Sequence, residues 1–141
     1  MKKIILTLLL AGSLTAVSFA QCDKKIVLNS SKTEHRDENG AITKTVDENA
    51  EVQIDKANFS VAINGEQRIS GNVKSTTCDW KTPFKEGKTV IKAVASNENG
   101  EEKDVTITIE GKDGKVNLYF QIEGEPGDKV RITADKFEAK G

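Results

Sequence analysis

The sequence predicts an all-β protein, an antiparallel meander of about eight or nine strands that forms a closed or nearly closed small barrel. Turn dipeptides recur at short intervals, at Asn39-Gly40, Asn64-Gly65, Asn99-Gly100 and Asp113-Gly114. Such pairs readily adopt the positive φ angles of tight hairpin turns. Between the turns, apolar and polar residues alternate with the period of a strand that has one solvated face. No segment has a convincing helical period.

Residues 104–110 show the alternation most clearly, because Val105, Ile107 and Ile109 fall on one face and the threonines between them on the other. The same pattern recurs through the chain after residue 23. It predicts strands at 24–34, 41–47, 50–56, 58–64, 66–76, 88–96, 102–110, 115–123 and 128–136. Short connections make neighbours in sequence neighbours in the sheet.

The stretch 77–87 breaks this rhythm, and within it residues 79–87 are the best candidate for a turn of helix. A barrel removes the exposed strand edges that promote aggregation, and eight strands give a barrel that is just wide enough to be filled or to hold one small ligand. The alternative is a two-sheet β-sandwich, whose crossing connection would fall at 77–87.

The first twenty residues read as a signal peptide, leaving residues 21–141 as a single β domain. Lys2 and Lys3 precede the short apolar run 4–11, and Ser18-Phe19-Ala20 places small residues before a cut at Gln21. We therefore expect an exported protein, periplasmic or extracellular, with no transmembrane segment after cleavage. Its 21 basic and 22 acidic residues give no basic footprint, so nucleic acid is not an expected partner.

The two cysteines, Cys22 and Cys78, favour a disulfide bond, because export leads to an oxidising compartment and the pairing leaves no orphan thiol. The alternative is a lipid anchor on Cys22. Gln21 occupies the position where a bacterial lipoprotein signal carries a small residue, and this argues against the anchor.

The motifs of common enzymes are missing from the sequence. His35 is the single histidine, and no closely spaced set of Cys and His ligands accompanies it, so no metal site is expected. There is no nucleophile elbow and no phosphate-binding loop. We predict that the protein is not an enzyme, has no catalytic residues and needs no cofactor.

Three aromatic residues are the candidate contacts for a ligand or partner: Trp80, Phe84 and Tyr119. Trp80 and Phe84 lie in the irregular stretch beside Cys78, where they either plug one end of the sheet or line a barrel mouth. Tyr119 lies on the solvent-facing side of a regular strand. Aromatic side chains often anchor interfaces.

The leading hypothesis is an exported non-catalytic β domain that binds a small apolar ligand or an envelope protein partner. A structural or interaction module of the cell envelope without a pocket is one alternative. A hydrolase that uses a pair of carboxylates is the other, since two acidic side chains suffice for that chemistry.

Overall fold

The computed structural model describes residues 24–97, 99–125 and 127–139, and this part of the chain is built from nine strands with no helix. The predicted signal peptide and Cys22 lie outside the described residues. The strands are β1 (Ile26–Arg36), β2 (Ile42–Ile54), β3 (Asn58–Ile63), β4 (Glu66–Thr82), β5 (Glu86–Ser96), β6 (Glu102–Lys112), β7 (Lys115–Ile122), β8 (Lys129–Thr133) and β9 (Lys136–Ala139).

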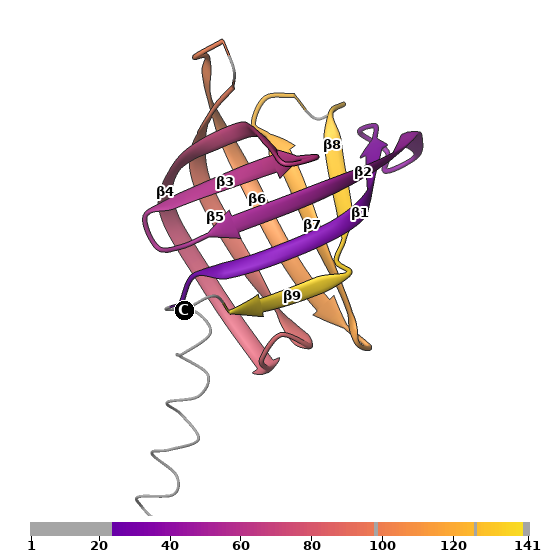
Figure 1. Cartoon of the computed structure of the whole chain (residues 1–141), viewed down its shortest axis with the longest axis vertical. Coiled ribbons are helices and arrows are strands. Elements are labelled where there is room, and N and C mark those ends of the chain that lie inside the picture. The colour runs from indigo at the N-terminus through magenta and orange to yellow at the C-terminus, as the bar shows by residue number, and fades with distance from the viewer. Residues whose placement is uncertain (1–23, 98, 126, 140–141) are drawn as a thin grey trace, which may run out of the picture.

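Strands β1 to β8 form a closed antiparallel barrel in which each strand pairs with the next (Figure 1). The barrel closes on β1, which pairs with β2 along one edge and with β8 along the other. The short β9 pairs with the first part of β1, from Ile26↔Ala139 to Asn29↔Lys136. The predicted all-β meander and barrel are confirmed, and the sandwich alternative is wrong.

The turn residues explain the hairpins. Asn64 and Gly65 have φ angles of 52° and 83°, and Asp113 and Gly114 have 54° and 80°. Both pairs therefore form two-residue hairpin turns with positive φ at each central position, whose twist matches that of the flanking strands. Asn-Gly and Asp-Gly tolerate this conformation at little steric cost.

Two of the predicted strands, 41–47 and 50–56, are one continuous strand, β2. The polar residues between them do not form a turn, because β2 stays paired with β1 on both sides of a register shift at Ser30/Lys32. Such a bulge bends a strand without ending it. Conversely, the predicted strand 128–136 ends early, as β8 at Thr133, and a strand that the sequence did not predict, β9, begins at Lys136. Between them the backbone N–H of Asp135 donates to the Asn29 carbonyl at 2.7 Å.

The expected turn of helix at 79–87 is also wrong. β4 continues to Thr82 and pairs with β5 as far as Thr82↔Glu86. The connection is a tight turn in which the Lys85 N–H donates to the Thr82 carbonyl at 3.1 Å and Phe84 has a φ of 62°. Proline at 83 suits a turn because its φ is fixed near the required value.

The inward-facing side chains form one hydrophobic core that runs through the barrel. Its centre is tightly filled, since Ile107 and Leu118 are only 1% and 2% exposed. The core comprises Ile26, Leu28, Ala50, Val52, Ile54, Phe59, Trp80, Ile91, Ala93, Ala95, Val105, Ile107, Ile109, Val116, Leu118 and Ile132.

The two ends of the barrel have different surroundings, and we name them by what they contain. The aromatic end has β9, the start of β1 and the β4–β5 turn at 83–85 (the lower end in Figure 1). The loop end has the connections 37–41, 64–65, 97–101 and 123–128.

Candidate functional site

Two of the aromatic candidates, Trp80 and Phe84, lie together at the aromatic end with a third ring, Phe137 of β9. The Phe137 ring centroid is 5.9 Å from that of Trp80 and 5.0 Å from that of Phe84, the second pair in an edge-to-face arrangement. Aromatic pairs at such distances are attractive. Trp80 is only 4% exposed, which favours a structural role for it over contact with a ligand.

The Trp80 indole also satisfies its polar atom inside the barrel. Its Nε1–H donates to Thr89 Oγ1 at 2.7 Å, and the Thr89 hydroxyl in turn donates to Cys78 Sγ at 3.6 Å. Two glycines make room for the ring: a Cβ on Gly87 would lie 2.6 Å from Trp80 Cδ2, and one on Gly111 would lie 2.8 Å from Trp80 Cζ3. Larger residues at these positions would force the indole to move.

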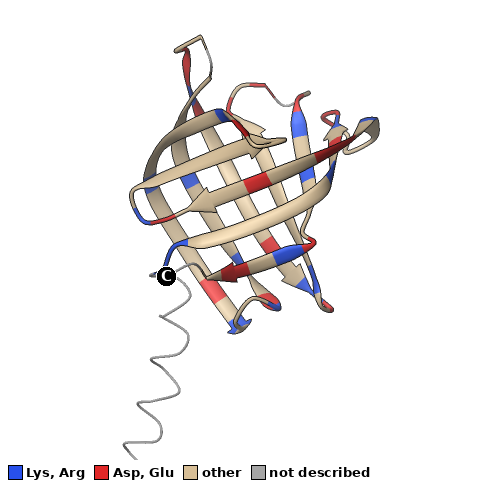
Figure 2. Cartoon of the chain, viewed as in Figure 1, with Lys and Arg blue, Asp and Glu red and all other residues tan. Residues whose placement is uncertain are grey.

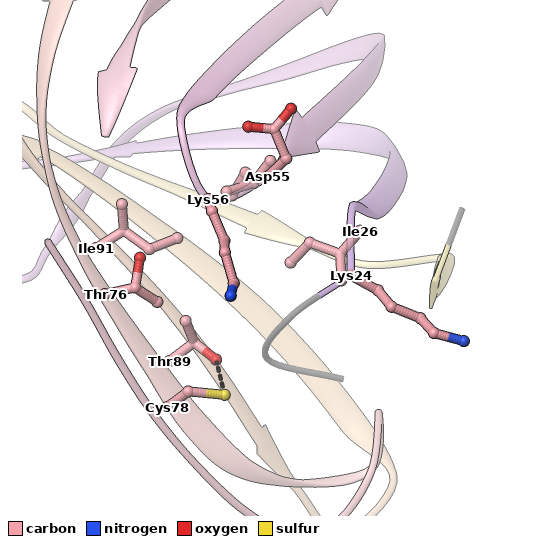
Figure 3. A pocket seen from close by; sticks show the side chains of 9 residues that line it. Lys24, Ile26, Asp55, Lys56, Thr76, Cys78, Thr89 and Ile91 are labelled. Atoms are coloured by element: carbon pink, nitrogen blue, oxygen red, sulfur yellow. Dashed lines mark hydrogen bonds between the residues drawn. The ribbon is translucent and has the colours of Figure 1, made fainter. Parts of the chain in front are cut away.

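Cys78 faces a small cavity of about 30 Å³ near the start of β1 (Figure 3). Lys24 and Ile26 line it on one side, and Cys78 and Thr89 line it on the other. Such a cavity has room for about one water molecule. Cys22 precedes Lys24 by two residues, and two residues span at most about 7 Å, so the predicted Cys22–Cys78 disulfide is compatible with Lys24 lining this cavity. Cys22 itself lies outside the described residues, and the bond stays a prediction.

The loop end contains a larger apolar hollow of about 100 Å³. The side chains that form its walls come from four neighbouring strands of the barrel. They are Ile69 of β4, Ala95 of β5, Val105 of β6, and Phe120 and Ile122 of β7. Ile69, Phe120 and Ile122 are half-buried and pack against the core without being covered by it.

Charged residues surround this hollow. Asn97, Glu101 and Lys103 belong to its lining. The Lys103 Nζ lies 3.0 Å from a carboxylate oxygen of Glu125 in the β7–β8 connection. This ion pair joins the start of β6 to the β7–β8 connection at the rim, and as a solvent-exposed pair it contributes little to stability.

Tyr119, the third aromatic candidate, lies far from the other two, in a groove on the outside of the barrel. We call this the arginine groove. It has a volume of about 310 Å³ and is lined by Arg36, Gly40, Thr108, Tyr119, Phe120, Gln121, Lys129, Val130 and Arg131. The Lys and Arg residues on β8 are visible in blue in Figure 2.

Strand pairing assembles the groove. Glu34 of β1 stands opposite Arg131 of β8, and Arg131 stands opposite Tyr119 of β7. Both arginines donate to the same carboxylate oxygen of Glu34, Oε1. The Arg131 Nη2 atom lies 2.7 Å from it and the Arg36 Nη2 atom 3.0 Å. Arg36 also donates from Nη1 to the Gly40 carbonyl at 3.3 Å.

These contacts shift the pKa values of Glu34 and Arg131. The hydrogen bond from Arg131, followed by that from Arg36, lowers the pKa of Glu34 against the opposing effect of burial. The same bond with Glu34 raises the pKa of Arg131, and Tyr119 adds to that rise. The Glu34 carboxylate and the Arg131 guanidinium are therefore both charged at neutral pH.

Neither the hollow nor the arginine groove was identified from the sequence as a site. Ile69, Phe120 and Ile122 carry the alternation of core residues, and nothing in that pattern marks where a barrel ends. Arg36 and Arg131 are far apart in sequence, and only the β1–β8 pairing joins them.

A scan of protein-family models and searches of curated proteins and solved structures find no match to this chain. Within the described ranges, no group of three or more His, Cys, Asp or Glu side chains could hold a metal ion. In the same ranges, no helix is long and apolar enough to span a membrane.

Proposed function

We propose that this chain is an exported, non-catalytic binding domain that takes a small apolar ligand group at the loop end of its barrel. The observation that carries the proposal is the hollow of about 100 Å³ walled by Ile69, Phe120, Ile122 and their apolar neighbours. Ligand pockets are typically concave and mostly apolar, with a few polar groups that fix orientation.

The size of the hollow limits what it takes. An apolar cavity of about 150 Å³ in another protein binds benzene, so a hollow of about 100 Å³ suits a group no larger than a small ring or a branched alkyl end. The side chains of Ala93, Ile107 and Leu118, each 2% exposed or less, fill the barrel below it. The ligand therefore inserts only one end, and its remainder lies at the charged rim near Lys103 and Glu125.

Binding of a neutral naphthylamine dye, whose emission rises in apolar surroundings, tests this proposal. Ala95→Leu would fill the hollow, because Ala95 belongs to its wall. Ala62→Leu is the matched control, since Ala62 is half-buried on β3 and lines a different surface depression. We expect saturable binding by the unchanged protein and by the control, and at least about tenfold weaker binding by Ala95→Leu, equivalent to about 1.4 kcal/mol.

Circular dichroism of each variant shows whether it is folded before the dye is added. Equal affinity of Ala95→Leu and the unchanged protein would contradict the proposal, and so would the absence of saturable binding by the unchanged protein.

An envelope protein partner is the second candidate function. The arginine groove favours it, because arginine and aromatic side chains such as Arg36, Arg131 and Tyr119 are the residue types enriched at protein contacts. If this candidate is right, substitutions of groove residues abolish binding of the partner, and Ala95→Leu leaves that binding unchanged.

A further inference from the structure

We propose that the arginine groove binds a carboxylate group of an acidic ligand. The proposal does not depend on the hollow at the loop end, because the groove lies on the outer face of β1, β6, β7 and β8.

The groove has a positive local charge, although the chain as a whole does not. Arg36, Lys129 and Arg131 line it, and its lining includes no Asp or Glu. Glu34 is the carboxylate that forms ion pairs with two of these cations, which leaves a local excess of positive charge. The whole chain has a formal charge of −1. A local positive field within a mildly acidic protein attracts an anion to this place and not to the surface in general.

The hydrogen-bonding capacity of the two arginines exceeds what Glu34 supplies. Both guanidinium groups donate to the same oxygen, Glu34 Oε1. The Nε atoms of Arg36 and Arg131 are buried without a hydrogen-bond partner among the described residues. Leaving such a donor unsatisfied is costly. A second carboxylate, brought by a ligand, would accept from the remaining guanidinium N–H groups, since Glu34 Oε1 takes one Nη2 group from each arginine.

Burial strengthens any ion pair formed here. The side chains of Glu34, Arg36 and Arg131 are 17%, 23% and 26% exposed, whereas those of the Lys74–Asp104 pair on another face are 51% and 52% exposed. Charge-assisted hydrogen bonds gain strength as water is excluded. The Arg36–Glu34–Arg131 cluster is thus a partly desolvated site, in contrast to the solvated pairs elsewhere.

Glu34 shows which chemistry the site accommodates, since two guanidinium groups already hold its carboxylate oxygen at 2.7 and 3.0 Å. Arginine recognises planar carboxylates through paired N–H groups. Tyr119 contributes an aromatic ring and a hydroxyl to the lining, next to Arg131 in the sheet. The ligand class is therefore a carboxylic acid, either a free dicarboxylate or an acidic side chain of a peptide.

The test is a titration of the purified protein followed by backbone amide NMR shifts. Succinate, a short acidic peptide and inorganic phosphate are added separately at constant ionic strength. We expect saturable shifts around residues 34–36, 119 and 129–131 with succinate or the peptide, and weaker binding of phosphate. Tighter binding of the peptide would identify a protein as the source of the carboxylate, and tighter binding of succinate would identify a small acid.

Variants assign the binding to the groove. Arg131→Gln removes the central cation and should weaken binding by about tenfold or more, the effect of losing one charged hydrogen bond. Lys129→Gln, which leaves the Glu34 ion pairs in place, should weaken it by a smaller factor without a loss of folding. Lys136→Gln on β9 is the matched control, because Lys136 is exposed at the opposite end of the barrel.

Three outcomes would overturn the proposal. The first is that neither succinate nor the peptide produces saturable shifts at millimolar concentration. The second is that Lys136→Gln weakens binding as much as Lys129→Gln does. The third is that phosphate binds as tightly as both carboxylates, which would remove the assigned ligand class.

Discussion

The aromatic end of the barrel is covered by three rings from two distant parts of the chain, whereas the loop end leaves half-buried aliphatic and aromatic side chains around a hollow. Phe137 of β9 contacts Trp80 and Phe84. At the other end Ile69, Phe120 and Ile122 are half-buried beside a hollow, and no ring of the described residues covers them in this way. The same alternating pattern leads into both ends. The difference teaches that the aromatic end is closed by Phe137 of the extra strand β9 together with Trp80 of β4, a combination that the loop end does not share.

The largest expected effect is at the aromatic end. Trp80→Ala removes a ring that is 4% exposed and contacts Phe137. It should lower the free energy of unfolding by about 3–5 kcal/mol, the usual cost of truncating a buried large aromatic residue. Urea unfolding followed by circular dichroism measures it, since the variant has no tryptophan. A loss smaller than that of Phe120→Ala would contradict the view that the aromatic end is the tighter one.

The predicted disulfide should have the next largest effect, also at the aromatic end. We expect Cys78→Ser to lower the free energy of unfolding by about 2–4 kcal/mol under oxidising conditions. Cys22→Ser should cost a similar amount, and a reductant should remove most of the difference between each variant and the unchanged protein. A thiol assay that finds both cysteines reactive in the unreduced protein would disprove the bond.

At the loop end, Phe120→Ala should cost only about 1–2 kcal/mol, because a half-buried ring removes less apolar area from water than a buried one. The same change enlarges the hollow, so the naphthylamine dye should bind more tightly. Paired urea and dye titrations measure the two effects. If stability falls and dye affinity does not rise, Phe120 does not restrict the hollow.

The smallest effect concerns pH. The pKa of Glu34 is lowered from its ordinary value of 4.5, mainly by the hydrogen bond from Arg131. The stabilisation from the ionised carboxylate is therefore complete above about pH 4.5 and is lost as the pH falls through the lowered pKa of the folded state. Glu34→Gln should be less stable than the unchanged protein at pH 7, and this difference should shrink in acid. Urea unfolding across that range measures it; a difference independent of pH would show that Glu34 stabilises the barrel by packing alone.

The sequence was sufficient for the strands and their hairpins because these signals are local, whereas it left a barrel and a sandwich both open. Asn64-Gly65 and Asp113-Gly114 specify hairpin turns by their own backbone preferences, and the alternation of Val105, Ile107 and Ile109 specifies one inward face. It failed where a tertiary contact decides the local structure. Pairing with β1 keeps β2 continuous through a polar stretch, and pairing with β5 extends β4 to Thr82.

The candidate sites were harder to predict for the same reason. Trp80, Phe84 and Tyr119 stood out by residue type, but the structure places the first two inside the aromatic end and only Tyr119 in a groove. The partners of Tyr119 come from β1 and β8, which meet only because the barrel closes. No spacing along the chain encodes that meeting.

Closure through β1 also has a consequence for the order of folding. Most strands pair with the strand that precedes them in sequence. The second edge of β1, however, is paired only by β8 and β9, as in the pairing of Ile26 with Ala139. Joining the first and last strands carries the greatest loop-closure entropy of any step. During synthesis the chain can therefore form the successive hairpins from β2 to β7 early. One edge of β1 stays unpaired until β8 and β9 have been made. β8 and β9 thus complete the fold, and the chain is most prone to aggregate before they pair with β1.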